Sequence, residues 1–295
     1  MKNKFFIFLI FLLILNNFSY AEQFKFETSK IEFADNGNLI NAEDGKAFSS
    51  DENIEINAKI FKYEKNTNLL KAFNGIAYYK SENLEIEFDN LNLDQDNSKT
   101  TATNNVKIFD INKKMLIESD LIIFDKKKNI LKSSTFSKMI DKNKNFLSSD
   151  SFTYNINDGI LKLENVYLKD INNNSFNIEF AFFDTIKSKL IGKDITVNLN
   201  NQTFDKENDP RIKGTSIIYQ DELTEITNGV FTTCKQTDSC PPWQLSAKKI
   251  QHDSQKQIIN YKGFLSQINK TLACAPFLNE NKIKLLVCFV LAPWG

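Results

Sequence analysis

The chain has very little arginine, histidine, glycine and proline for its 295 residues. Arg211 is the only arginine and His252 the only histidine, beside 9 glycines and 5 prolines. The 37 basic residues balance the 37 acidic ones, so the formal net charge at pH 7 is zero. Proteins that bind nucleic acids usually carry a basic excess, and bidentate recognition of phosphate favours arginine. The composition therefore argues against both kinds of binding.

Sequence motifs of enzymes and metal sites are also absent. His252 has no partners at the spacing of a zinc site or a catalytic triad. The chain contains no glycine-rich phosphate loop and no nucleophile elbow. We therefore expect no catalytic residue, no metal ligand and no cofactor, and predict that the protein is not an enzyme. A secreted polysaccharide-active enzyme stays an alternative, because carboxylate pairs on a β-solenoid need no local motif.

Phenylalanine, in contrast, is abundant at 26 residues, and hydrophobic residues make up 41% of the chain. Phenylalanine favours strands. Since glycine and proline are scarce, we expect Asn, Asp and Lys to form the turns between strands.

The first 21 residues have the pattern of a secretory signal peptide. Lys2 and Lys4 precede an unbroken apolar run from Phe5 to Leu15, and Ser19 and Ala21 are small residues at the cleavage positions. The run is short for a membrane span. We expect cleavage before Glu22 and export, with an uncleaved membrane anchor as the alternative.

An internal repeat of about 30 residues organises the chain after this segment. Taking Tyr63 as an origin, apolar or small residues recur at fixed offsets around five equivalent positions, which are Phe33, Tyr63, Leu93, Phe124 and Tyr154. Weaker copies centre on Tyr219 and His252. Within one copy, as in Ile54–Ala58, apolar and polar residues alternate, and this period of two predicts a half-buried strand. His252 is therefore interpreted as a structural strand residue.

The alternation changes phase by one residue at the same place in each copy. It does so between Ala58 and Phe61, and again between Phe88 and Leu91. A one-residue change would turn the side chains to the other face unless a bulge or corner restores them. We predict a corner there, polar turns at the strand ends, and an all-β jellyroll of stacked strand–turn–strand repeats. A parallel β-helix is the alternative fold.

Two cysteines, Cys234 and Cys240, lie in a polar loop that precedes two prolines and Trp243. Their spacing in an exported chain makes a local disulfide one alternative. Free thiols, or bonds to cysteines elsewhere, are the others.

The segment from Leu190 to Lys262 resembles the OstA family, and within it the lipopolysaccharide-assembly branch LptD. The matching pieces include Asp209–Gly214, Asn228–Cys234 and Cys240–Ala247. The earlier repeats are similar to the domain that this branch shares with LptA and LptC. The resemblance implies a V-shaped β-jellyroll in the periplasm, reaching the outer membrane, whose apolar groove carries lipopolysaccharide acyl chains. We expect residues 22–262 to form this domain.

The repeat register selects candidates for the lipid-facing side chains, namely Ile56, Phe61, Ile86, Leu91, Ile122 and Phe152. The resemblance implies lipopolysaccharide as the ligand and other Lpt proteins as partners. These are an LptA-like bridge paired through an edge strand, and an LptE-like plug if a barrel were present. A free-standing LptA-like bridge protein and an adhesin-like structural solenoid are further alternatives.

The family pattern stops after Lys262. Residues 263–295 lose the alternation and contain the apolar run Leu285–Ala292. We therefore interpret them as an atypical tail, produced by a truncation or a reading-frame change, and expect the ordered sheet to end near Lys262.

Overall fold

The computed structural model describes residues 24–49, 53–200, 209–235, 243–253, 255–256, 258–267, 270–278 and 284–290. The predicted signal peptide and Cys240 lie outside these residues. None of the described residues form a helix with the length and apolar character needed to cross a membrane.

Antiparallel strands make up almost all of this part of the chain, and its only helical segments are two short 3-10 turns, η1 (Asp35–Gly37) and η2 (Lys65–Thr67). The strands are β1 Lys25–Ala34, β2 Leu39–Ser49, β3 Ile54–Glu64, β4 Leu69–Tyr79, β5 Leu84–Asp94, β6 Lys99–Asp110, β7 Met115–Asp125, β8 Ile130–Ser133, β9 Ser137–Ile140, β10 Phe146–Ser149, β11 Ser151–Asn155, β12 Ile160–Lys169, β13 Ser175–Asp184, β14 Lys189–Asn198, β15 Arg211–Gln220, β16 Leu223–Thr232, β17 Trp243–Asp253, β18 Ile258–Gln267, β19 Lys270–Leu278 and β20 Lys284–Val290. The all-β prediction is confirmed.

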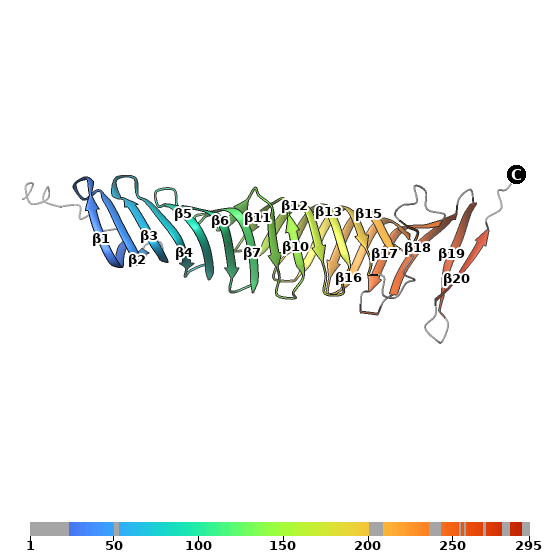
Figure 1. The fold of residues 1–295 in the computed structure, drawn as a ribbon. Helices are drawn as coiled ribbons and strands as arrows, with labels where there is room; N and C mark the ends of the chain where they lie inside the picture. Colours follow the sequence, from blue (N-terminus) through green and yellow to red (C-terminus); the bar gives the residue numbers. More distant parts are fainter. Residues whose placement is uncertain are drawn as a thin grey trace, which may run out of the picture.

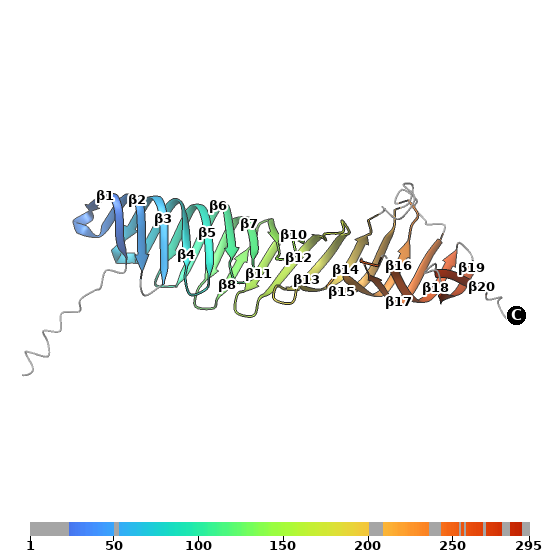
Figure 2. The same ribbon diagram turned by 90° about the horizontal axis from the view of Figure 1, so that it is seen from below.

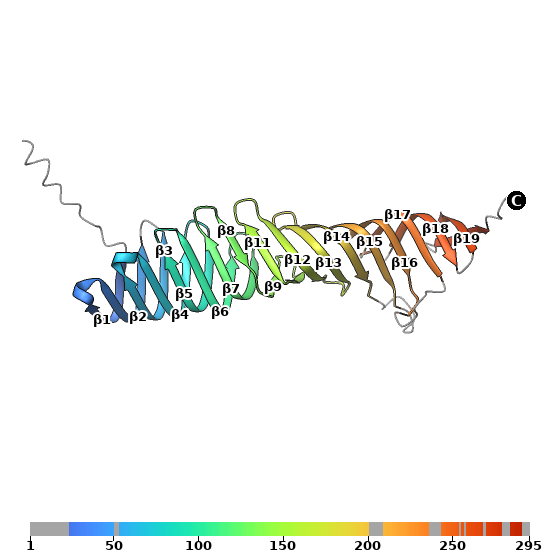
Figure 3. The ribbon, with the colours of Figure 1, turned by 90° about the horizontal axis from the view of Figure 1, so that it is seen from above.

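All strands belong to one sheet, in which neighbours in sequence pair antiparallel from β1–β2 to β19–β20. Between β7 and β12, two strands are each divided into two short ones. The first is divided into β8 and β9, and the second into β10 and β11. The result is an elongated stack with β1 at one end and β20 at the other (Figures 1, 2 and 3). Antiparallel pairing excludes the parallel β-helix.

A corner bends the strands near their middle, as the phase change predicted. In β3 the buried positions run Ile54, Ile56, Ala58 and then Phe61, Tyr63. On alternate strands the bend falls at a residue with left-handed backbone, and this series comprises Asp44, Asn74, Asn104, Asn105, Asn165, Asp194 and Asn228. Asn and Asp tolerate this conformation better than other residues with a side chain. Both halves of each bent strand therefore face one interior.

The strand ends are joined by turns that use the same chemistry. Left-handed backbone recurs in the turns at Asn53, Asn68, Asn83, Ser98, Lys114, Asn129, Lys144, Asn173 and Ser188. Only two glycines of the described residues, Gly37 and Gly159, have a positive φ. The prediction that Asn, Asp and Lys form the turns is confirmed, with serine added.

The core is one apolar cluster between the two halves of the folded sheet, and it follows the stack from Phe24 to Ile250. The repeat origins Tyr63, Leu93, Phe124, Tyr154 and Tyr219 are all buried in it. Phe33, the first origin, is 59% exposed. It differs because β1 is the end strand and pairs with β2 alone among the described strands.

The expected end of the sheet near Lys262 is wrong. Strand β18 continues to Gln267, β19 pairs with it, and β20 pairs with β19. Strand pairing requires extended backbone and free hydrogen-bonding groups, and a continuous apolar run satisfies this as well as an alternating one. Loss of the period of two was therefore insufficient evidence for loss of the sheet.

Candidate functional site

The six predicted lipid-facing residues all lie on the inner face of the folded sheet. Ile56, Phe61, Ile86, Leu91, Ile122 and Phe152 are between 0% and 3% exposed. In one half of the fold, the pairs Phe61–Ala72, Ala72–Leu91, Leu91–Ala102 and Ala102–Ile122 form a continuous row from strand to strand. Large and small side chains alternate along this row, which lets them interdigitate with the opposite half.

A second row crosses the other half of the sheet. Ile56 pairs with Ala77, Ala77 with Ile86, and Ile86 with Ile108. The rows face one another and continue along the stack. The six candidates therefore line one interior, as predicted, and in this structure their own packing closes that interior to solvent.

Opposite the corner, the strand ends of the two halves meet along a line that we call the mouth of the fold. Polar contacts bridge the mouth. The Nζ atom of Lys113 donates to the carbonyl oxygen of Ile156 at 3.0 Å, and that of Lys142 donates to Ile186 at 2.6 Å. Farther along, the amide of Asn172 donates to Glu222 Oε2 at 3.0 Å. These contacts join residues 43 to 50 positions apart in sequence.

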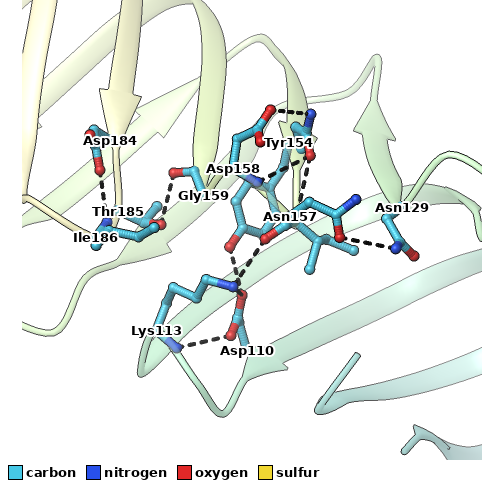
Figure 4. A network of polar contacts seen from close by, with 12 residues as sticks. Asp110, Lys113, Asn129, Tyr154, Asn157, Asp158, Gly159, Asp184, Thr185 and Ile186 are labelled. Atoms are coloured by element: carbon cyan, nitrogen blue, oxygen red, sulfur yellow. Dashed lines mark hydrogen bonds and ion pairs between the residues drawn. The ribbon is translucent and has the colours of Figure 1, made fainter. Parts of the chain in front are cut away.

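Tyr154 and Asp110 form the most deeply buried of these bridges (Figure 4). The Tyr154 hydroxyl donates to Asp110 Oδ2 at 2.6 Å, and the backbone N–H of Lys113 donates to Oδ1 at 2.9 Å. The Lys113 ammonium lies 3.8 Å from Oδ2. Burial, and then the hydrogen bond to Asp110, raise the pKa of Tyr154, so its phenol stays neutral and remains a donor.

Two neighbouring turns at the mouth share the pattern Asp-x-Asn-x-Asn, at residues 141–145 and 170–174. In the second, Asp170 accepts hydrogen bonds from the backbone of Asn172 and Asn174 and from the Asn174 side chain. Asp141 is held in the same way in the first. The pattern resembles part of a calcium loop, yet these carboxylates cap their own turns. In the described part of the chain, no group of His, Cys, Asp or Glu could hold a metal ion.

Beside these turns the mouth contains a pocket of about 340 Å³, which we call the mouth pocket. Its lining comes from four turns, one strand and Gln255, and consists of Asn143, Asn145, Ile171, Ser188, Tyr219, Asp221, Glu222 and Gln255. The sequence patterns used above did not indicate it. The one sequence signal that could have indicated the pocket is the repeated Asp-x-Asn-x-Asn pattern, because it distinguishes these two turns from the other polar turns of the stack.

The stack is open at its N-terminal end. Ile31 and Phe33 of β1 occupy the positions of the buried Phe61 and Tyr63 but are 42% and 59% exposed. Phe24 covers part of the core end and contacts the Tyr63 ring with centroids 5.4 Å apart. The edge of β1 that pairs with no described strand thus lies beside exposed apolar side chains, as an edge that pairs with another chain would.

His252 lies in β17, where it is buried opposite Thr224, and burial lowers its pKa. Its interpretation as a strand residue is confirmed. The backbone carbonyls of Cys234 and Asp209 accept hydrogen bonds from the Arg211 guanidinium, which fixes the start of the cysteine loop. Cys234 is buried, and the bond to Cys240 stays a prediction because Cys240 is outside the described residues.

The structure thus has an apolar interior that is packed shut, polar groups along the mouth, and an edge of β1 that pairs with no other described strand. The fold is an all-β, folded antiparallel sheet. No family model matches the chain, and no curated protein matches it significantly.

Proposed function

We propose that the protein is a non-catalytic conduit for the acyl chains of lipopolysaccharide, equivalent to the periplasmic domain of LptD. The observation that carries the proposal is the unbroken apolar interior of a long folded sheet. Acyl chains need a continuous apolar surface and no chemistry, and burial of each methylene group from water contributes about 0.8 kcal/mol.

The way the mouth is closed supports this function. Hydrogen bonds such as Lys142 to Ile186 join the two halves along it, and these can exchange for bonds to water. An acyl chain can therefore enter from the side when the halves separate, while its polar head stays outside. Outside the region of β8 to β11, both halves of each strand are continuous through the corner, so separation of the halves requires a hinge movement and no strand breakage.

The open end supports a partner of the same architecture. Strand β1 has one unpaired edge among the described strands, and Ile31 and Phe33 are exposed beside the core end. An LptA-like bridge protein adding a strand there would extend both the sheet and the interior. Under this proposal the protein is a periplasmic component of lipopolysaccharide transport to the outer membrane.

Site-specific crosslinking tests the conduit. A photoreactive phenylalanine analogue at Phe61, on the inner face, should capture lipopolysaccharide when the protein is incubated with it. The matched control is the next residue, Lys62, which is on the same strand and exposed. Phe152 and its neighbour Thr153 form a second pair on β11. Equal capture within each pair would contradict an interior path and leave only adhesion to the surface.

A polysaccharide-active enzyme is the second candidate, because Asp221 and Glu222 place two carboxylates in the mouth pocket. Glycoside hydrolysis uses such a pair. Release of reducing ends from bacterial polysaccharides by the purified protein, abolished in Glu222→Gln, would favour it over the conduit.

A further inference from the structure

The mouth pocket contains a buried polar atom that nothing in the described protein satisfies. Ser188 is 4% exposed, and its hydroxyl oxygen is fully buried without a hydrogen-bond partner. Most buried polar atoms are paired with protein or with ordered water. Ser188 lines the pocket, and a rotation of its side chain would bring the hydroxyl to a ligand or a water molecule seated there.

The charged side chains that line the pocket are acidic. Asp221 and Glu222 line it, and the buried Asp141 and Asp170 lie in the two turns that flank it. The pKa of Tyr219 is raised by burial first and then by the four nearby carboxylates Asp170, Asp141, Glu222 and Asp221. The lysines beside the lining residues do not line the pocket: Lys142 donates to the Ile186 carbonyl, Lys187 pairs with Asp184, Lys256 pairs with Asp253, and Lys144 is exposed. The pocket therefore favours a cation or a neutral donor over a phosphate.

The remaining lining shows which kind of donor fits. Asn143 and Gln255 contribute exposed amides, which can bind hydroxyl groups as donors and acceptors, whereas the Asn145 amide is already bound to Asp141 and Tyr219. Ile171, exposed at the rim, adds an apolar surface. The volume of about 340 Å³ is at the small end of the range for small-molecule pockets. A polyhydroxylated ring with one ammonium group matches the carboxylates, the amides and the apolar rim together.

We propose that the mouth pocket binds one amino-sugar unit, with its ammonium group toward Asp221 and Glu222 and a hydroxyl group toward Ser188. This site is separate from the apolar interior and does not rest on the proposed transport of acyl chains. The same chemistry is found in a free amino sugar and in the head of a glycolipid that carries one.

Calorimetric titration of the mature protein with D-glucosamine tests the site, at a mildly acidic pH where the amine is protonated. Glucosamine should bind at millimolar or lower concentration. N-acetylglucosamine, which has the same ring without the charge, should bind at least about tenfold more weakly, because it loses the charge-assisted hydrogen bonds. Absence of glucosamine binding, or equal affinity for the two sugars, would overturn the proposal.

Two pocket variants and one control locate the binding. Asp221→Asn with Glu222→Gln removes both charges with little change of shape, and should reduce glucosamine affinity by at least about tenfold. Ser188→Ala should reduce it by a smaller factor. The control Glu225→Gln changes a carboxylate on β16 that faces Lys249 at 2.7 Å, outside the pocket, and should keep full affinity. Unchanged binding in the double variant would place the sugar elsewhere and refute the assignment.

Competition identifies the source of the sugar. Micelles of a glycolipid with a glucosamine head should displace free glucosamine if the pocket receives a lipid head, and matched micelles with a glucose head should not. Displacement by both micelles would show an effect of the lipid surface and count against the pocket. Displacement by neither assigns the site to the free sugar.

Discussion

At the scale of single residues, the Tyr154 hydroxyl satisfies a carboxylate that is almost completely buried. Tyr154→Phe keeps the ring in the core but removes the 2.6 Å hydrogen bond to Asp110. We expect a loss of about 1–3 kcal/mol in the free energy of unfolding, because Asp110 stays buried with one partner fewer. Urea denaturation measures it.

Tyr167→Phe is the matched control for that measurement. Tyr167 lies on β12 between the buried Val166 and Leu168, and its side chain is only partly buried on the outer face. Its removal should change stability by less than about 0.5 kcal/mol. Equal losses in the two variants would show that the hydrogen bond across the mouth contributes nothing specific.

His252 gives the protein a predicted pH dependence. Burial lowers its pKa below the ordinary value of 6.5, so in the range below 6.5 the unfolded chain binds a proton that the folded protein does not. Stability should therefore fall as the pH decreases through this range, by at most about 1.4 kcal/mol per pH unit.

His252→Phe isolates this contribution, since His252 is the only histidine. The difference in unfolding free energy between the two proteins should grow in favour of the variant from pH 7 to pH 5.5, while carboxylate effects cancel. A constant difference would mean that His252 is protonated equally in the folded and unfolded states.

At the scale of the strand, the corner depends on residues that accept left-handed backbone. Asn74, at the bend of β4, has φ 53° and an exposed side chain. Asn74→Val should cost about 1–2 kcal/mol, because a β-branched residue is strained there. Asn74→Gly should leave stability within about 0.5 kcal/mol of the original, since glycine adopts this backbone freely.

A third substitution separates backbone strain from β-propensity. Lys71→Val, on the same strand but away from the bend, introduces the same side chain into regular β backbone and should not destabilise. Thermal unfolding followed by circular dichroism compares the three variants. A loss at Lys71 as large as that at Asn74 would contradict a special role for the corner.

At the scale of the whole molecule, the stack has an unfinished end. The double substitution Ile31→Lys and Phe33→Lys places charges on exposed side chains of β1. It should leave the melting temperature nearly unchanged, because neither side chain is buried, and should reduce association of the protein at high concentration. Sedimentation velocity over a concentration series measures the association.

A charge change elsewhere is the control for this experiment. Ile111→Lys alters an apolar side chain that is 48% exposed in a turn, away from β1. It should leave association as in the original protein. Equal loss of association in both variants would mean that general surface hydrophobicity drives the association and that the edge of β1 does not.

The sequence by itself determined the parts of this fold that repeat. The 30-residue period, the inner positions such as Phe61 and Leu91, the corner, and turns made of Asn, Asp and Lys all follow from local patterns. They do so because each copy must bury the same face and turn at the same place, so the signal is repeated along the chain. Where the pattern weakened, after Lys262, the inference about the sheet failed.

Only the tertiary structure decided which parts meet across the mouth. Tyr154 contacts Asp110, 44 residues earlier, because the strands cross the stack obliquely and the two halves face one another with an offset in sequence. The slant of the strands sets this offset, and the alternation of apolar and polar residues does not encode the slant. The mouth pocket and the exposure of Phe33 arise in the same way, from which turns and strands happen to be neighbours in space.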